Sequence, residues 1–202
     1  MKKYAANFPN CGYLVNEFSK ADLTPVWNEV NKIQNNFDNS ETINHSFTST
    51  VKKEYKIIDS LSYLESLLLP FAHIYNSNFE FKNPDTSYFL EAAWVNFQEA
   101  GEFFSPHTHK GDFSFALYMQ VPFLIEDEHA YLSTTDKTIE TAAGFLFYYN
   151  YALGEIRPQY IAVDSSWENS MIFFPGSMLH SVQPFFTSKE YRITISGNLM
   201  RT

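Results

Sequence analysis

Three histidines have the residue types and the order of a metal site. His107 and His109 stand two apart in the sequence, and His180 follows more than seventy residues later. Side chains two apart on a strand point to the same face, so His107 and His109 can converge on one ion. Two neutral imidazoles with one further ligand suit iron, zinc, copper or nickel. The pattern predicts a metal site, provided that the fold brings His180 beside the pair.

A barrel of strands is the architecture that can unite these histidines. From residue 88 onward, short runs rich in aromatic and branched side chains alternate with clusters of Gly, Pro, Asn and Asp, a pattern typical of strands. About seven or eight such strands suit a jelly roll, the double-stranded β-helix or cupin-like barrel, whose open mouth brings distant strand ends together. We expect strands near residues 89–97, 113–121, 144–151, 160–163, 170–174, 181–185 and 191–199.

The part of the chain before residue 85 has helical periodicity instead. Apolar residues recur at spacings of three and four over 26–33 and again over 58–68, which predicts two amphipathic helices. Thr24 and Pro25 resemble the N-cap and the first residue of the earlier helix. Pro70 should end or kink the later one. We therefore expect mainly β structure flanked by a helical layer.

Composition indicates one compact unit. With 202 residues, 45% of them hydrophobic, the chain can bury a substantial core, and we expect a single domain over 1–202, with a helical scaffold at 1–85 and the jelly-roll core and metal site at 86–202. A net charge of −9 disfavours nucleic acid as a partner. Cys11 is the only cysteine, and no run of about 18 apolar residues occurs, so a soluble, cytoplasmic protein is expected, with a homodimer left open.

Six motifs between residues 90 and 200 resemble, in order and spacing, those of the iron(II)/2-oxoglutarate-dependent oxygenases, and above all the small members found in phages and marine bacteria. The resemblance says little about residues 1–85. The motifs are Trp94-Val95-Asn96, His107-Thr108-His109, Gly111-Asp112-Phe113-Ser114-Phe115, Phe173-Phe174-Pro175-Gly176, His180-Ser181-Val182-Gln183-Pro184 and Arg192-Ile193-Thr194-Ile195-Ser196-Gly197-Asn198.

The resemblance implies a role for individual residues. It makes His107 the first iron ligand and His180 the distal ligand of a facial triad with open positions. It also implies that Arg192 grips the distal carboxylate of 2-oxoglutarate with its planar fork. Thr194, two residues further on the same strand, could donate a hydroxyl hydrogen bond to that carboxylate, and Tyr118 could assist from a neighbouring strand.

The third ligand departs from the commonest family motif, which is His-x-Asp or His-x-Glu. Here the third residue of the motif is His109, and Asp112 follows three residues later. Strand geometry favours His109 as the ligand, because a residue two along faces the same ion. Charge balance favours Asp112, because a carboxylate offsets the charge of iron. Between these alternatives we favour His109.

The function implied by the resemblance is that of a dioxygenase with iron(II) and 2-oxoglutarate as cofactors and dioxygen as co-substrate, acting as a hydroxylase of an unidentified substrate. One alternative is a cupin metalloenzyme that does not use 2-oxoglutarate. Gly101, the His107-Thr108-His109 motif and Pro175-Gly176 partly match the cupin pattern, although the expected glutamate after the second histidine is missing. Another alternative is a non-catalytic jelly-roll binding or structural module.

Overall fold

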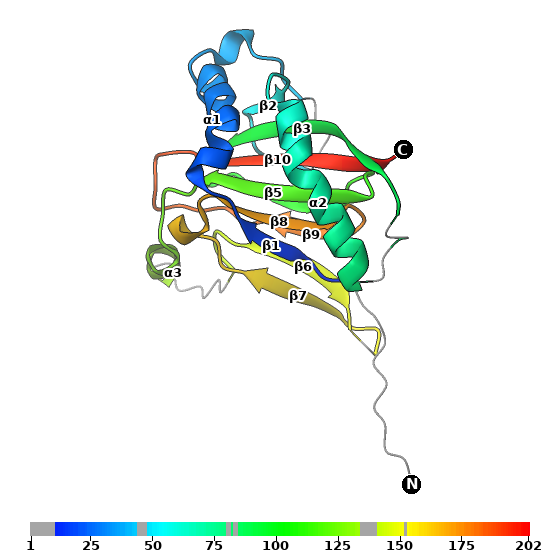
Figure 1. Ribbon diagram of the computed structural model, residues 1–202. Coiled ribbons are helices and arrows are strands. Elements are labelled where there is room, and N and C mark those ends of the chain that lie inside the picture. Colours follow the sequence, from blue (N-terminus) through cyan, green and yellow to red (C-terminus); the bar gives the residue numbers. More distant parts are fainter. Residues whose placement is uncertain (1–10, 44–47, 80–81, 83–84, 134–140, 152) are drawn as a thin grey trace.

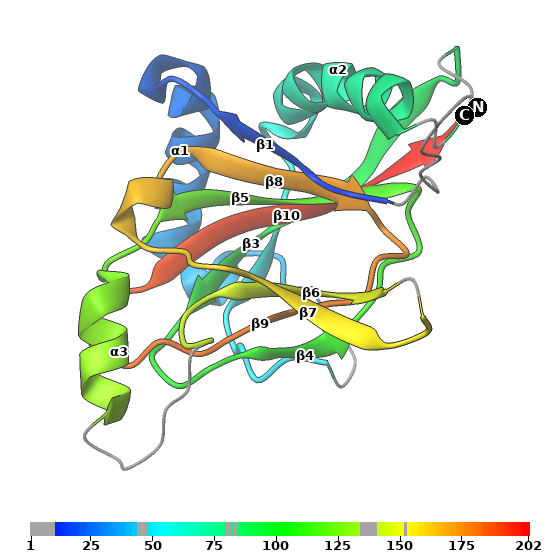
Figure 2. The same cartoon turned by 90° about the horizontal axis from the view of Figure 1, so that it is seen from below.

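Two antiparallel sheets face each other, and helices cover the outer face of the larger sheet (Figures 1 and 2). The computed structural model describes all residues except 1–10, 44–47, 80–81, 83–84, 134–140 and 152. The larger sheet contains, in order, β1 (Leu14–Glu17), β8 (Ser170–Pro175), β5 (Phe113–Gln120), β10 (Arg192–Arg201), β3 (Tyr88–Gln98) and β2 (Glu54–Ile57). The smaller sheet contains, in order, β4 (Phe104–His107), β9 (His180–Val182), β6 (Phe145–Asn150) and β7 (Ile156–Ile161). The predicted mainly β jelly roll with flanking helices is confirmed.

The helices begin at positions that differ from the predicted ones. Helix α1 spans Lys20–Gln34, and its N-cap is Ser19, whose side chain accepts a hydrogen bond from the backbone N–H of Asp22. The Asp22 carboxylate in turn accepts from the backbone N–H of Ser19, which completes a capping box. The prediction of Thr24 as the N-cap was therefore wrong, because this reciprocal pair starts the helix earlier and Pro25 lies inside it.

The second long helix, α2, spans Leu61–Phe79 and runs through Pro70 without ending there. Burial explains why the helix continues, since Leu64, Leu68 and Ala72 are completely buried and their packing offsets the hydrogen bond that the proline cannot make. A third helix, α3 (Ile125–Ser133), and two short 3-10 helices, η1 (Phe37–Asn39) and η2 (Ser165–Trp167), complete the helical elements among the described residues.

The N-terminal part of the chain is not helical throughout. Strand β1 pairs with β8, and β2 pairs with β3, so two segments before residue 85 extend the larger sheet at its two edges. Each of these strands has four residues, which is too short for an alternating pattern to stand out in the sequence. The helical scaffold and the barrel are thus joined through the sheet itself.

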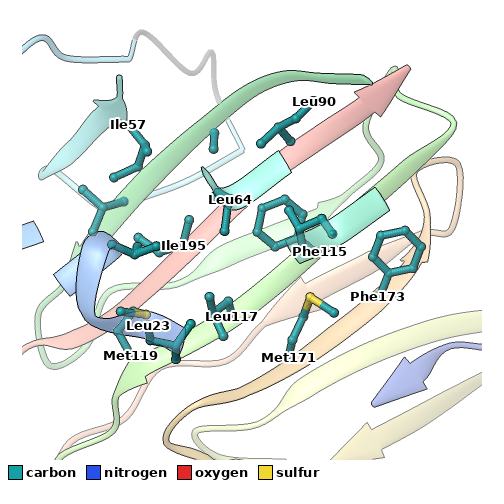
Figure 3. Packing of buried hydrophobic residues seen from close by; sticks show 14 of the residues in the cluster. Leu23, Ile57, Leu64, Leu90, Phe115, Leu117, Met119, Met171, Phe173 and Ile195 are labelled. Carbon is teal, nitrogen blue, oxygen red and sulfur yellow. The ribbon is translucent and has the colours of Figure 1, made fainter. Parts of the chain in front are cut away.

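The larger sheet has an apolar outer face and a partly polar inner face. Alternate residues of β3, such as Val95 and Phe97, belong to the core between this sheet and helices α1 and α2, part of which Figure 3 shows. Asn96 and Gln98, between and beyond them, are buried on the inner face. A second cluster, which includes Phe145 of β6 and the completely buried Phe185, packs against that inner face. The inner face is where polar groups gather.

No helix among the described residues is both long and apolar enough to cross a membrane.

Candidate metal centre

The three predicted histidines come together at one end of the space between the sheets. His107 ends β4, His180 begins β9, and the two residues are directly paired. Figure 2 shows these two strands side by side. His109 lies in the loop that follows β4. One candidate ligand atom from each histidine lies within 4.8 Å of the others. Ring centroids are 4.3 Å apart for His107 and His180, and 5.0 Å for His107 and His109. This is a separation that one metal ion can bridge.

Two of the rings are oriented by hydrogen bonds to backbone carbonyls. Nδ1 of His107 lies 2.7 Å from the carbonyl oxygen of Ser105, and Nδ1 of His180 lies 2.8 Å from that of Met178. A carbonyl oxygen only accepts, so Nδ1 must carry the hydrogen in both rings. In the neutral ring this leaves the lone pair on Nε2. Such outward Nδ1–H bonds typically fix the tautomer of metal-binding histidines.

Burial keeps these rings in the form that binds metals. His180 is 3% exposed, and burial together with nearby charge on His107 and His109 holds its pKa well below the usual value. Burial also lowers the pKa of His107, although the hydrogen bond to Ser105 acts in the opposite direction. A metal requires the neutral imidazole, so a lowered pKa favours the binding state at neutral pH.

The loop that carries His109 is held by the turn between β8 and β9. The backbone N–H of His109 donates to the carbonyl of Gly176 at 2.7 Å, and the N–H of Gly176 donates to the carbonyl of Asp112 at 3.0 Å. A Cβ atom at Gly176 would lie 2.3 Å from the carbonyl oxygen of Gly111, so only glycine allows this approach. The sequence suggested that His107 and His109 share one strand face, but the structure brings their rings together through this turn.

Asp112, the alternative third ligand, is engaged elsewhere. Its Oδ1 lies 3.0 Å from Nε of Arg201, and its Oδ2 accepts a hydrogen bond from the backbone N–H of Arg201 at 3.1 Å. Among the described residues, the cluster of groups able to hold a metal consists of His107, His109 and His180. The carboxylate thus ties the loop to the end of β10.

A cavity leads inward from the histidines between the two sheets. Its volume is about 40 Å³. Tyr118 and Thr194, both predicted to contact 2-oxoglutarate, lie on its wall and are directly paired on β5 and β10. Burial raises the pKa of Tyr118, so its hydroxyl stays protonated and able to donate. Besides the three histidines, the lining residues are Trp94, Asn96, Gln98, Phe104, Phe115, Ala116, Tyr118, Phe145, Phe174, Val182, Thr194 and Ser196.

Arg192 lies behind this wall, and Gln98 connects it to the cavity. Nε and Nη2 of Arg192 donate to Oε1 of Gln98 at 3.1 and 2.8 Å. Nη1 donates to the carbonyl of Ala143 at 2.6 Å, and Nη2 also donates to that of Gln183 at 2.8 Å. The side chain is 1% exposed, and burial lowers its pKa to about 10, against the opposing effect of Tyr118 and Glu128. The guanidinium is therefore a buried cation, held by neutral oxygens, at neutral pH.

Gln98 was not identified from the sequence as a functional residue. The signal that could have found it is its position two residues after Asn96, on the same face of the same strand. Its contact with Arg192 depends on the register of β3 and β10, in which Arg192 and Gln98 are directly paired.

Comparison with solved structures defines the class of fold. A prolyl-4-hydroxylase from Pseudomonas putida is 12% identical, with a TM-score of 0.59 over 95% of this chain and 94% of that chain. The non-heme alpha-ketoglutarate-dependent epimerase SnoN from nogalamycin biosynthesis is also 12% identical, with a TM-score of 0.59 over 94% of this chain and 76% of that one. A viral collagen prolyl hydroxylase from Paramecium bursaria Chlorella virus-1 is 12% identical, with a TM-score of 0.52 over 94% and 96%. The chain has the oxygenase jelly-roll fold.

The sequence itself identifies the family. A search of curated proteins gives no significant match. A family described as "Putative 2OG-Fe(II) oxygenase" matches residues 92–198, more than half of the chain, and the chain belongs to this family. Its cofactors are iron(II) and 2-oxoglutarate, and the donor set fits the metal, since His107 and His180 leave Nε2 free and His109 lies beside them.

Proposed function

We propose that this protein is an iron(II)- and 2-oxoglutarate-dependent dioxygenase that hydroxylates its substrate, with His107, His109 and His180 as the iron ligands. The observation that carries the proposal is the convergence of three imidazoles on one point, two of them fixed with Nδ1 protonated. Three protein ligands would leave open positions on the metal for co-substrates. The all-histidine set brings no charge of its own to the metal.

2-Oxoglutarate would bind to the polar side chains on the inner face of the larger sheet. The distal carboxylate would lie against Thr194 and Tyr118, in the field of the buried Arg192 cation. Gln98 binds the guanidinium of Arg192 from the cavity side. When 2-oxoglutarate binds, the Gln98 side chain would either rotate away from the guanidinium or keep it in its present orientation. Nδ2 of Asn96 donates to the Thr194 hydroxyl at 3.2 Å, which leaves the hydroxyl hydrogen free to point to a ligand.

The cofactors supply the oxidation when they are bound: one oxygen atom of dioxygen enters a C–H bond to give C–OH, and the other enters succinate as 2-oxoglutarate loses carbon dioxide. The protein positions the reacting molecules and excludes water. Phe145 and Phe174 lie within 5.3 and 4.8 Å of the His180 ring, centroid to centroid, so the inner side of the metal centre is apolar. The aromatic surroundings would shield the reacting atoms from solvent.

Iron content of single variants tests the ligand set. His180→Ala and His109→Ala should each abolish stoichiometric iron(II) binding, measured by anaerobic reconstitution and metal analysis. Asp112→Ala should retain iron and lose about 1 to 2 kcal/mol of stability, because it removes the ion pair with Arg201 and the hydrogen bond from the Arg201 backbone N–H.

The matched control is His129→Ala, which removes an exposed histidine on α3 and should retain full iron content. Loss of iron in Asp112→Ala together with normal iron in His109→Ala would contradict the all-histidine set and assign the third position to the carboxylate.

A further inference from the structure

A groove lies directly in front of the metal centre. Its volume is about 330 Å³, and it shares four lining residues with the inner cavity: Trp94, Phe104, His107 and His109. A molecule in the groove would therefore touch His107 and His109. The remaining lining residues are Thr48, Glu91, Thr108, Lys110 and Asn198.

A β-bulge places Glu91 in this groove. The pairing of β3 with β10 joins Asn198 to Ala92 and then Leu199 to Leu90, so Glu91 is the extra residue that has no partner. Bulges occur beside active sites, where the local kink re-aims a side chain. The Glu91 side chain is exposed and makes no ion pair with any residue that the structure describes. The bulge thus presents an unpaired carboxylate to a ligand.

The opposite charge comes from Lys110, on the loop that follows His109. Lys110 is also exposed and unpaired among the described residues, and it does not bridge to Glu91 although both line the same groove. Two opposite charges held apart in one groove complement a molecule that carries both charges. A polycation would be repelled by Lys110, and a polyanion would be repelled by Glu91.

Asn198 adds hydrogen-bonding capacity next to the bulge. It lies opposite Ala92 on β10, and its carboxamide makes no hydrogen bond with a described residue. Its Oδ1 is buried without a partner, so rotation of the amide could turn this acceptor to a ligand N–H at little cost. Trp94 and Phe104 supply aromatic walls beside the histidines, with ring centroids 5.9 Å from His109 and 6.0 Å from His107.

We propose that the groove binds a small zwitterion of the free amino-acid class as the primary substrate. Its ammonium group pairs with Glu91 and donates to Asn198, and its carboxylate faces Lys110. The carbon skeleton then lies between Trp94 and Phe104, toward the metal centre. The assignment of this ligand as a substrate rests on the proposed dioxygenase function, whereas its binding in the groove does not.

Ligand-observed NMR on the full chain tests the binding without turnover. The protein carries zinc(II) in place of iron(II), together with 2-oxoglutarate, and the probes are the common free L-amino acids. Each probe is compared with its Nα-acetyl derivative, which lacks the ammonium, and with its methyl ester, which lacks the carboxylate. We expect at least one free amino acid to bind, and both blocked forms to bind about tenfold or more weakly, since a charge-assisted contact of about 1.4 kcal/mol corresponds to that factor.

Variants of the groove locate the binding. Glu91→Gln and Lys110→Gln should each weaken the selected amino acid about tenfold. Glu190→Gln and Lys189→Gln, exposed charges outside the groove, are the matched controls and should leave the affinity unchanged.

The inference is overturned if no free amino acid binds, or if binding is unaffected by Glu91→Gln. A separate titration with iron(II) and 2-oxoglutarate distinguishes failure of this inference from failure of the proposed dioxygenase function. If both cofactors bind while no amino acid does, the dioxygenase function stands and the substrate class is wrong.

Discussion

Arg192 is a buried cation that is positioned to bind an anion. Every acceptor that the structure gives its guanidinium is a neutral oxygen, from Gln98, Ala143 or Gln183. A buried charge without an opposite charge in contact is costly, and a carboxylate that arrives in the cavity would lower that cost. The strand position of Arg192 was predictable from its sequence motif, but its link to Gln98 was not, because strand register is a property of the folded sheet.

Arg192→Lys should weaken 2-oxoglutarate binding by more than tenfold and leave iron bound. Lysine keeps the charge but lacks the planar fork that contacts Gln98 and the two carbonyls, so the cation cannot hold the same position. Calorimetric titration of the iron-loaded protein with 2-oxoglutarate, together with metal analysis, measures both effects.

The control is Arg157→Lys on β7, where the arginine pairs with Glu155 on the surface. Unchanged affinity for 2-oxoglutarate in Arg192→Lys would remove Arg192 from the co-substrate site.

At the scale of elements, the long strands were predictable and the short ones were not. Strands β3, β5 and β10 have 11, 8 and 10 residues, and each was predicted to within two residues of its observed ends. Strands β1, β2 and β4 have four residues each and gave no periodic signal. The convergence of His107 and His109 was predicted from a shared strand face, but β4 ends at His107 and His109 lies in the loop that follows.

Gly176→Ala tests the turn that holds the second histidine. The added Cβ would collide with the backbone of Gly111 and displace the loop that carries His109. Groups that orient metal ligands typically contribute roughly 10- to 100-fold to metal affinity, and we expect a loss of that size.

Competition with a metal-binding dye measures the affinity, and Ser177→Ala, an exposed position in the same turn, is the control. Wild-type metal affinity in Gly176→Ala would show that the contact between the two turns does not position His109.

For the whole molecule, stability should depend on pH through a buried carboxyl group. Glu54 on β2 is 7% exposed, and its Oε1 has no hydrogen-bond partner among the described residues. Burial, with a smaller effect of the charge on Glu102, raises the pKa of Glu54 to about 7. Between pH 4.5 and about 7, the folded protein keeps this proton while the unfolded chain releases it. The free energy of unfolding therefore falls as the pH rises through this range.

Glu54→Gln should remove this loss of stability at higher pH. The neutral amide avoids the cost of a buried charge, so the variant should be more stable than wild type by on the order of 2 kcal/mol at pH 8, and the gain should vanish near pH 4.5. Urea unfolding at both pH values measures the difference.

Glu17→Gln, at an exposed position of the other four-residue N-terminal strand, is the control and should change little. A gain of equal size at both pH values would contradict the assigned cause.

Anaerobic titration of the iron(II)-loaded protein with 2-oxoglutarate tests the central claim most directly. Chelation of iron(II) by a keto acid gives a weak visible charge-transfer band, and we expect this band to appear and to saturate at one equivalent per chain. Iron binding without the band would contradict the use of 2-oxoglutarate and favour a metalloenzyme of another type. Failure to bind iron at all would contradict the metal centre itself.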